Sequence, residues 1–416
     1  MKLYKELLTN KNFLLITAGR LFKRSALTLF TLELIWLTME LTSNSPLYLS
    51  IMTMAETLPF IIFGLYGGAK ADKWNKKKVM VIGNSCSALL LLSIPCLNAV
   101  NLLNYYTLLM IAIAITIFSC FSEPCYRAIL PELLSKTKLK EANALLDSVQ
   151  RGVTIFVPAS IGLLLKFFSE IHLFSLAFLL MATAVAFQLM VEYRPFNHSA
   201  EETQIKSTTF HGIKDSLSFL KGHPEITFII AGQGLSILIN TGLWRVGLPI
   251  YLEGYLNENI TTFGYITGMM GVTSFITSLA LGISKKYNPR VVFNVGMGLW
   301  GLGLLMIGTL PTMPIIYIAT ILIGVGQASE GLSRVVILQE KVPANMLGKV
   351  FSTSSSINYT SDTISLGAVS SLLGLFTIAT LFSGGGTLIL MIGLLGAVFG
   401  RVHKNGRRHL QTKKSG

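Results

Sequence analysis

Long apolar stretches separated by short polar segments recur along the whole chain, and this pattern predicts its architecture. A stretch of about 20 apolar residues crosses the hydrocarbon core of a bilayer as an α-helix. Such stretches cover residues 13–37, 47–69, 79–97, 105–127, 149–168, 173–193, 225–252, 262–284, 291–310, 314–334, 351–376 and 378–400. The pattern therefore predicts an all-α membrane protein with twelve transmembrane helices.

Basic residues gather in alternate connecting segments. If the N-terminus lies inside, the inside segments carry most of the 34 Lys and Arg residues, whereas the outside loops contain Lys166. Cytoplasmic loops of membrane proteins carry such an excess. The alternation predicts a multi-pass protein of the plasma membrane with both termini in the cytoplasm. It also explains the net charge of +14 without nucleic acid as a partner.

The composition excludes several classes of protein. Only 13% of the residues are charged, about half the share of a soluble domain, and 51% are hydrophobic. The four cysteines lie in or beside apolar stretches, and the six histidines lie in loops and the tail. Neither set has the spacing of metal ligands or of a catalytic group. We therefore expect no cofactor, no metal and no catalytic residues, and no Walker motif is present for direct coupling to ATP.

Short sequences return at constant offsets. Ala18-Gly19-Arg20 returns as Ala231-Gly232-Gln233, and Lys73-Trp74-Asn75 as Lys286-Tyr287-Asn288, both 213 residues later. Ser122-Glu123 with Arg127 returns as Ser329-Glu330 with Arg334, 207 residues later. The repeats predict a duplicated six-helix bundle. We assign residues 1–193 to the first bundle, 194–224 to a cytoplasmic linker with an amphipathic stretch, and 225–416 to the second bundle and a basic tail.

A charged motif lies between the second and third predicted helices. It reads Gly68-Ala69-Lys70-Ala71-Asp72-Lys73-Trp74-Asn75-Lys76-Lys77. With Gly68, Asp72, Lys73 and Lys77 in place, the chain resembles the major facilitator superfamily, although Asn75 stands where a second Gly is usual. The resemblance implies that family's fold of two pseudo-symmetric six-helix bundles, with alternating access to a central site. We expect a functional monomer that moves a small molecule.

Two further segments resemble the branch of bacterial macrolide and siderophore efflux proteins. They are Ala128–Leu133, which leads to Glu141–Leu145, and Gly212–Leu220 followed by His223-Pro224. The exporter-type motif of helix 5 is partial: Pro158 and Gly162 are present, but Val157 stands where a Gly-Pro pair is usual. The motif therefore leaves the direction of transport open.

Basic residues inside two predicted spans are the candidate substrate site. Arg20, Lys23 and Arg24 lie in the first span and Arg245 in the seventh. A charge at the centre of a membrane helix costs about 2.5–3.5 kcal/mol. Arg20, Lys23 and Arg24 share an arc of about 100° on a helix, so all three can face one passage. We interpret them as an anion-binding patch; the alternative is that they form structural ion pairs with acids on neighbouring helices.

Acids inside the spans are candidates for proton coupling. Glu33, Glu56 and Asp362 are the members of this group that we select. A carboxyl group removed from water holds its proton more readily, which suits a proton carrier. The alternative is that these acids only balance the charge of the basic patch.

The repeated Glu and Arg residues are the candidate cytoplasmic gate. Glu123 with Arg127, and Glu330 with Arg334, are spaced i,i+4 at the inner ends of helices 4 and 10. Together with the loop that contains Gly68, Asp72, Lys73 and Lys77, they would close the inside. The alternative is that they anchor helix ends.

These observations favour a secondary active transporter. We expect proton-coupled export, as an antiporter, of a small anionic organic solute such as a carboxylate siderophore. The alternatives are a multidrug or macrolide efflux pump and, less favoured, a lysophospholipid flippase or a membrane enzyme.

Overall fold

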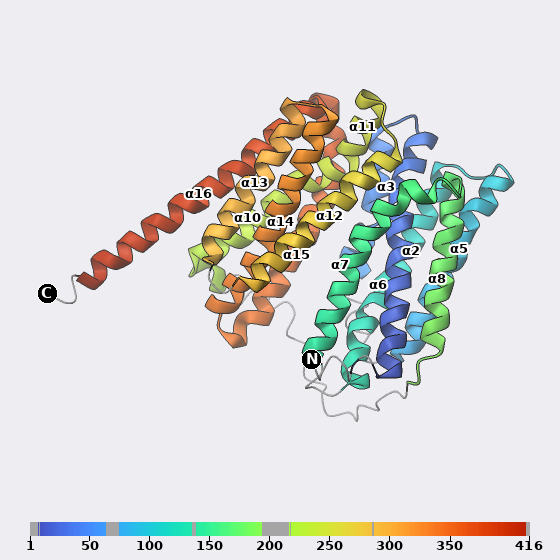
Figure 1. The fold of residues 1–416 in the computed structure, drawn as a ribbon, viewed down its shortest axis with the longest axis horizontal. Helices are drawn as coiled ribbons and strands as arrows, with labels where there is room; N and C mark the ends of the chain where they lie inside the picture. The colour runs from blue at the N-terminus through green and yellow to red at the C-terminus, as the bar shows by residue number, and fades with distance from the viewer. Residues whose placement is uncertain are drawn as a thin grey trace. The chain divides into compact units, whose positions relative to one another are not determined.

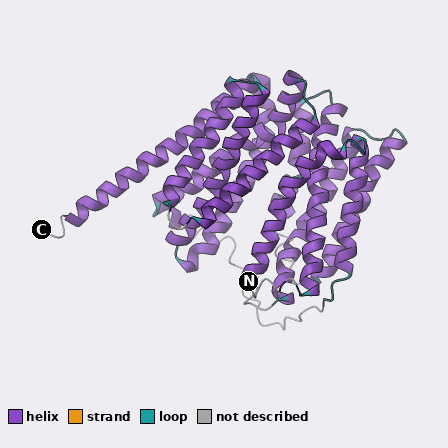
Figure 2. Cartoon of the chain, viewed as in Figure 1, coloured by secondary structure: helices purple, strands orange, loops and turns teal. Residues whose placement is uncertain are grey.

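The fold is known from a computed structural model, which describes residues 7, 9–63, 75–134, 139–193, 216, 218–284 and 287–412. The secondary structure of this part of the chain is helical, with short loops and turns and no strand (Figure 2). Each of the twelve predicted spans is helical over most of its described residues.

Helices up to the linker run in the order in which they were predicted. They are α2 (Lys11–Leu41), α3 (Pro46–Ala55), α5 (Lys76–Ala99), α6 (Tyr105–Leu133), α7 (Leu139–Leu164) and α8 (Glu170–Leu189) (Figure 1). After α3 the chain makes a turn at residues 56–57 and continues as a helix to residue 63.

The helices after the linker follow the same plan. They are α10 (Pro224–Gly242), η2 (Leu243–Gly247), α11 (Leu248–Leu256), α12 (Ile260–Ile283), α13 (Pro289–Thr309), α14 (Met313–Lys341), α15 (Ala344–Leu375) and α16 (Ile378–Thr412). The short η2 segment is a π-helical turn within one continuous apolar stretch, Pro224–Leu256.

Asparagine side chains start several of these helices. The Asn75 side chain accepts a hydrogen bond from the Lys78 backbone at the start of α5, and Asn288 does the same for Arg290 at the start of α13. Asn is a favoured N-cap because its short side chain satisfies a free backbone N–H. The two residues are repeat equivalents, so the Asn75 departure from the family motif has a structural reason.

The chain divides into two compact units. Unit 1 contains residues 1–202 and 245–268, and unit 2 contains residues 203–244 and 269–416. The end of the seventh predicted span and the start of the eighth thus belong to the unit that holds the first six. In unit 1, α2 packs on α7 and α8, and α5 on α6 and α8; in unit 2, α10 packs on α15 and α16, and α13 on α14 and α16.

The same residues bring equivalent helices together in both units. A Cβ atom placed on Gly83 would lie 3.5 Å from Ser122 Cβ, and one placed on Gly296 would lie 2.9 Å from Ser329 Cβ. Gly83 and Gly296 are 213 residues apart, the offset of two of the sequence repeats, and Ser122 and Ser329 belong to the third. Equivalent helices therefore meet in the same way in both units, which agrees with the predicted pseudo-symmetric bundles.

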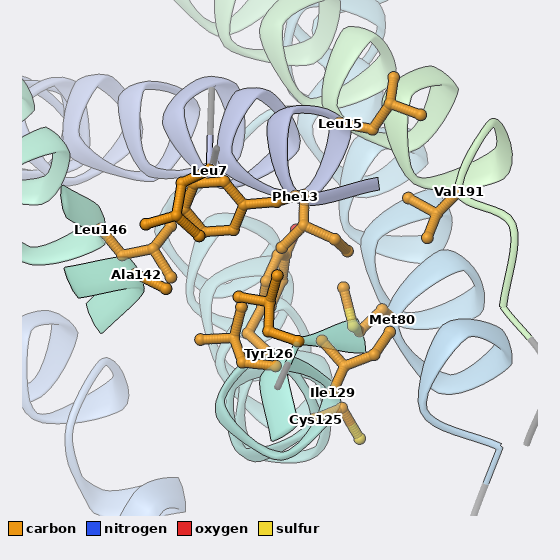
Figure 3. Close-up of a cluster of buried hydrophobic side chains, with 13 residues drawn as sticks. Leu7, Phe13, Leu15, Met80, Cys125, Tyr126, Ile129, Ala142, Leu146 and Val191 are labelled. Carbon is orange, nitrogen blue, oxygen red and sulfur yellow. The ribbon is translucent and has the colours of Figure 1, made fainter. Parts of the chain in front are cut away.

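A buried apolar cluster closes one end of unit 1. It is built from α2, α5, α6, α7 and the segment after α8, with Phe13, Met80, Tyr126, Leu146 and Val191 among its members (Figure 3). Its side chains hold the first span against its neighbours. Arg20, Lys23 and Arg24 follow one to two turns further along the helix.

Nine segments of the described residues are long and apolar enough to cross a membrane. The other three predicted spans correspond to α2, α7 and α15. α2 carries several charges, α7 begins with a charged turn, and α15 is rich in Ser and Thr. Twelve spans therefore remain a prediction, although a helix is present in each place.

Candidate functional site

A polar face runs along α2 through the depth of the helix. Thr17, Arg20, Arg24, Thr28 and Thr31 follow one another at intervals of three or four residues, so they share one side of the helix. Arg24 is exposed within unit 1, and the other four are partly exposed. A lipid-facing side of a membrane helix is apolar, so this face suits a water-filled passage.

Lys23 points away from this face into the interior of unit 1. Its side chain is 2% exposed, and its Nζ lies 2.9 Å from Glu123 Oε1. The same nitrogen donates a hydrogen bond of 2.8 Å to Ser122 Oγ and lies 4.9 Å from the centre of the Tyr126 ring. Three groups of α6 therefore hold the Lys23 ammonium, and Glu123 neutralises it.

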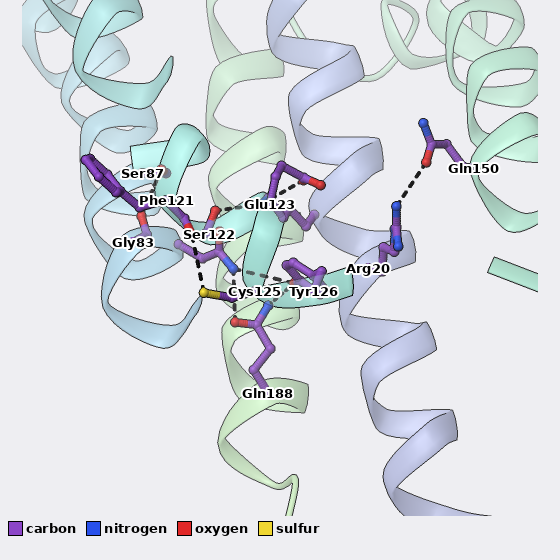
Figure 4. Close-up of polar contacts among 12 residues, drawn as sticks. Arg20, Gly83, Ser87, Phe121, Ser122, Glu123, Cys125, Tyr126, Gln150 and Gln188 are labelled. Atoms are coloured by element: carbon purple, nitrogen blue, oxygen red, sulfur yellow. Dashed lines mark hydrogen bonds and ion pairs between the residues drawn. The ribbon is translucent and has the colours of Figure 1, made fainter. Parts of the chain in front are cut away.

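Tyr126 extends this network to two more helices. Its hydroxyl accepts hydrogen bonds from the side-chain amides of Gln188 on α8 and, at 3.5 Å, Asn84 on α5. Asn84 also donates to Gln188 Oε1 at 3.0 Å. Figure 4 shows the Gln188 side chain meeting Tyr126 beside α6. The buried polar groups are satisfied by one another, so the network is a rigid support for Lys23 rather than an open binding site.

Arg20 and Arg24 remain on the polar face. Arg20 Nη2 donates to the Gln150 Oε1 of α7 at 3.3 Å, and Figure 4 shows it reaching away from the Glu123 network. In the described residues no carboxylate lies within ion-pair distance of either arginine. Of the three bases predicted to form one patch, the structure therefore separates Lys23 from the other two.

Arg245 forms a second ion pair, at an irregular point of two helices. It lies in the η2 turn and binds Glu56, which lies in the turn after α3. Glu56 also accepts a hydrogen bond of 2.6 Å from Thr31 of α2. Thr31, Glu56 and Arg245 are each 10 or 11 residues from an end of their helical segment, about 15 Å along a helix axis. The cluster therefore lies near the middle of the membrane.

The candidate coupling acids have different surroundings. Glu33 is 1% exposed, and its Oε1 has no hydrogen-bond partner among the described residues. Asp362 accepts a hydrogen bond of 2.5 Å from Thr241 in unit 2, and Glu56 is paired with Arg245. Glu33 is thus the predicted coupling acid that has a buried oxygen with no hydrogen-bond partner in the described residues.

The predicted gate is described in part. Gly68, Asp72 and Lys73 lie outside the described residues, as does the side chain of Arg127, while Lys77 Nζ donates to the carbonyl oxygens of Leu189 and Val191 at 2.8 Å. The i,i+4 pair Glu330–Arg334 is present, with 3.6 Å between Oε1 and Nε. Glu123 binds Lys23 of α2, and its predicted pair with Arg127 falls outside the described residues.

The exporter-type residues pack tightly on α12. A Cβ atom on Gly264 would lie 2.6 Å from the Pro158 carbonyl oxygen, and one on Gly268 would lie 2.8 Å from Ala159 Cβ. One on Gly162 would lie 2.6 Å from the Tyr265 hydroxyl. The glycines thus allow the α7 and α12 backbones to approach closely, which fits a seal between these helices.

Ser122, Tyr126 and Gln150 support the basic residues, and sequence reasoning did not single them out for that role. Ser122 carried a signal, because it is repeated as Ser329 beside the repeated acid. Tyr126 and Gln150 carried none, since their roles depend on which helices pack together.

Comparisons with known proteins agree with this architecture. The family model of the Major Facilitator Superfamily matches residues 20–361. The MFS-type transporter YfiS of Bacillus subtilis is 25% identical over 89% of this chain and 88% of its own. The staphyloferrin A transporter of Staphylococcus aureus is 23% identical over 75% of this chain and 77% of its own. Macrolide efflux protein A of Streptococcus pyogenes is 21% identical over 83% and 85%.

A solved structure shows the same fold. A bacterial homologue of the iron transporter ferroportin, in an inward-facing state, superposes with a TM-score of 0.72 at 15% identity, over 94% of this chain and 99% of its own. The family model spans most of the chain, from the basic residues of α2 to the polar stretch of α15. The protein therefore belongs to the Major Facilitator Superfamily and is a multi-pass membrane transporter rather than an enzyme.

Proposed function

We propose that this transporter moves a small organic anion, of the class of carboxylate siderophores, out of the cell across the plasma membrane. The observation that carries the proposal is the exposed Arg24 on the polar face of α2, beside the partly exposed Arg20. Export would proceed by alternating access of the two bundles to a central site. Proton movement would supply part of the driving force.

The charge of the α2 region favours an anion. Arg20, Lys23 and Arg24 carry three positive charges, and Glu123 neutralises the one on Lys23. Two guanidinium groups therefore remain for a ligand, and guanidinium groups bind carboxylates through paired, charge-assisted hydrogen bonds. The similarity to a staphyloferrin A transporter supports a siderophore as the solute.

Glu33 is our proposed proton-coupling acid in unit 1. It is buried, and one of its oxygens has no hydrogen-bond partner in the described residues. Such a carboxyl group is stable when protonated and costly when charged, so it exchanges a proton as its surroundings change. The close packing of Pro158 and Gly162 on α12 supports export, since the resemblance links this motif to exporters.

Efflux of a macrolide-like or other drug is the second candidate. The uncompensated acid Glu33 would attract a cation, and macrolide efflux protein A is among the relatives. The two candidates differ in the charge that the site must hold. Substituting Arg24 would impair export of an anion and would leave export of a cation unchanged or improved.

Uptake into everted membrane vesicles tests the proposal, because it measures export. The assay compares Arg24→Gln with Lys166→Gln, which removes an exposed base from a loop, using a labelled citrate-type siderophore. A lost charge-assisted hydrogen bond of about 1.5–3 kcal/mol predicts that Arg24→Gln slows export roughly 10- to 100-fold. An uncoupler should reduce wild-type export. Unchanged export by Arg24→Gln at normal membrane abundance would refute the anion proposal.

A further inference from the structure

The two acids that the sequence repeats, Glu123 and Glu330, have different partners in the two bundles. Glu123 binds the ammonium of Lys23 at 2.9 Å. At the offset of 213 residues that relates α2 to α10, the equivalent of Lys23 is Ser236. Lys23, which neutralises Glu123, is therefore replaced by the neutral Ser236 in the bundle that contains Glu330.

The other bases of α2 are replaced as well. Arg20 corresponds to Gln233 and Arg24 to Ile237. Arg20 of α2 donates a hydrogen bond to Gln150 of α7, and its equivalent Gln233 of α10 accepts one of 3.2 Å from Asn358 of α15. The second unit therefore keeps a hydrogen bond at this position but has no charge there. The interior of unit 2 near α14 thus lacks the positive charge of its counterpart.

Glu330 is deeply buried and poorly compensated. Its side chain is 4% exposed, and its Oε1 accepts no hydrogen bond from the described residues. Its charged neighbour is Arg334, at 3.6 Å, which also donates to Ser354 Oγ at 3.3 Å. A buried carboxylate that has one counter-charge and an oxygen without a hydrogen bond is expensive to keep ionised.

Other charged groups on the packed helices are engaged elsewhere. Arg290 of α13 and Lys341 of α14 both bind Glu225, and Asp362 of α15 accepts from Thr241. α12, which also packs on α14, carries no charged residue between Ile260 and Ile283. Arg334 is therefore the charged group that faces Glu330 from the described residues of these helices.

Ser354 of α15 accepts from Arg334 of α14, so the two helices meet at this point. Two hydroxyls near it in the sequence, Ser333 Oγ of α14 and Thr353 Oγ1 of α15, are buried and have no hydrogen-bond partner in the described residues. Arg334 Nε also makes no hydrogen bond there, and its contact is the ion pair with Glu330. Buried polar groups that have no protein partner are satisfied by water. The contact can thus pass protons through water between Glu330 and the helix end that the charge pattern places inside.

We propose that Glu330 is a proton-binding site of the transport cycle, loaded and unloaded through the contact of α14 with α15 at Arg334 and Ser354. Its carboxylate takes up a proton from water to form the neutral acid, and returns it to water when the contact is hydrated. The inference rests on the proposed proton coupling, and adds to it a site in the second bundle. Glu33 would serve the first bundle.

Infrared difference spectroscopy of the purified full-length protein tests the site without any substrate, since the proton itself is the probe. A buried protonated carboxyl group gives a carbonyl band that disappears when the group ionises. We expect the wild type to show such a band. We expect it to be diminished in Glu330→Gln and unchanged in Glu340→Gln, which alters an exposed acid of the same helix. Glu33→Gln should remove a separate component.

A proton count and a conservative variant complete the test. The protons taken up between about pH 8 and pH 5 should fall by about one per chain in Glu330→Gln relative to Glu340→Gln. Glu330→Asp, which keeps the carboxyl group, should shift the band rather than delete it. An unchanged band and an unchanged count in Glu330→Gln, or loss of the band only in Glu33→Gln, would overturn the assignment. Because no solute is present in this experiment, that result would not bear on the anion proposal, which the transport assay tests separately.

Discussion

The Lys23–Glu123 ion pair leads to an asymmetric prediction for its two single variants. Glu123→Gln leaves an ammonium group that is 2% exposed, with Ser122 and the Tyr126 ring as its remaining contacts. Removing one partner of a buried pair costs about 3–5 kcal/mol. The hydroxyl and the aromatic face offset part of that loss. We therefore expect Glu123→Gln to destabilise the protein by about 3 kcal/mol.

Lys23→Met should cost much less. It leaves the Glu123 side chain, which is 38% exposed and can be hydrated, and Met fills a volume close to that of the Lys stem. An ion pair with one accessible partner is worth about 1 kcal/mol. The double variant should resemble Lys23→Met, because no buried charge then remains unpaired. The effects of the single variants should therefore not add.

Buried thiols provide the assay. Cys120 and Cys125 are fully buried, so a thiol-reactive fluorescent dye labels them only as the bundle unfolds, and Cys96→Ser removes an exposed thiol from the background. Melting temperatures in detergent should fall in the order wild type, Lys23→Met and the double variant together, then Glu123→Gln. Equal losses for the two single variants, or a larger loss for Lys23→Met, would refute the reasoning.

Three further predictions concern packing and the inner end of unit 1. Gly386→Ala should lower the melting temperature, because its Cβ would press on a carbonyl oxygen of α13 at 2.6 Å, whereas Gly384→Ala, with nothing within 4 Å, should leave it unchanged or raise it slightly. Gly264→Leu should separate α12 from α7 and lower transport and stability together, while Gly282→Leu in the same helix should not. Tyr193 is shielded from water and donates a hydrogen bond to Glu132, and both raise its pKa above the ordinary value of 10.0. The Tyr193 hydroxyl therefore keeps its proton to higher pH in the folded state than in the unfolded state. The resulting stabilisation is present below about pH 10 and is lost above it. Melting curves at high pH should therefore show a smaller further loss in Tyr193→Phe than in the wild type.

The helices and their symmetry could be predicted from sequence, because both depend on patterns within the chain. Each apolar stretch had to become a helix, since a backbone in lipid must satisfy its own hydrogen bonds. The repeats were informative because Gly83 and Gly296 permit the same close contact with Ser122 and Ser329. The spans at α2, α7 and α15 are more polar than the nine apolar segments. Their polar residues include members of the candidate site, so the feature that suits them to function also weakens the apolar pattern of a membrane crossing.

The partners of the buried charges could not be predicted. Sequence spacing identifies neighbours on one helix, so Glu123 was assigned to Arg127, four residues away. The structure shows that Glu123 binds Lys23, which is 100 residues distant in the chain and which that spacing could not indicate. Arg245 and Glu56 were both selected as candidates, but nothing in the sequence indicated that they bind each other. Such pairs depend on helix packing, which becomes visible only in three dimensions.

The loss of bases from the second bundle carried a signal that the repeat comparison could have used. Arg20, Lys23 and Arg24 correspond to Gln233, Ser236 and Ile237, whereas Glu123 is kept as Glu330. Glu330 has Arg334 of its own helix as counter-charge, whereas Glu123 has Lys23 of another helix. This difference between the repeats is the basis of our proposal of a proton site in the second bundle.

The sign of the transported charge determines how export responds to the membrane potential. Each charge that crosses a potential of about 100 mV changes the free energy by about 2.3 kcal/mol. Exporting a dianion in exchange for one proton moves about three charges in the favourable direction, which corresponds to about 7 kcal/mol at that potential. Exchanging a monovalent drug cation for one proton moves no net charge. If Arg24 and Arg20 hold the solute, export should therefore fall sharply when a potassium ionophore collapses the potential and leaves the pH gradient in place. Export that follows the pH gradient alone would identify the solute as a cation and would assign Arg20 and Arg24 to another role.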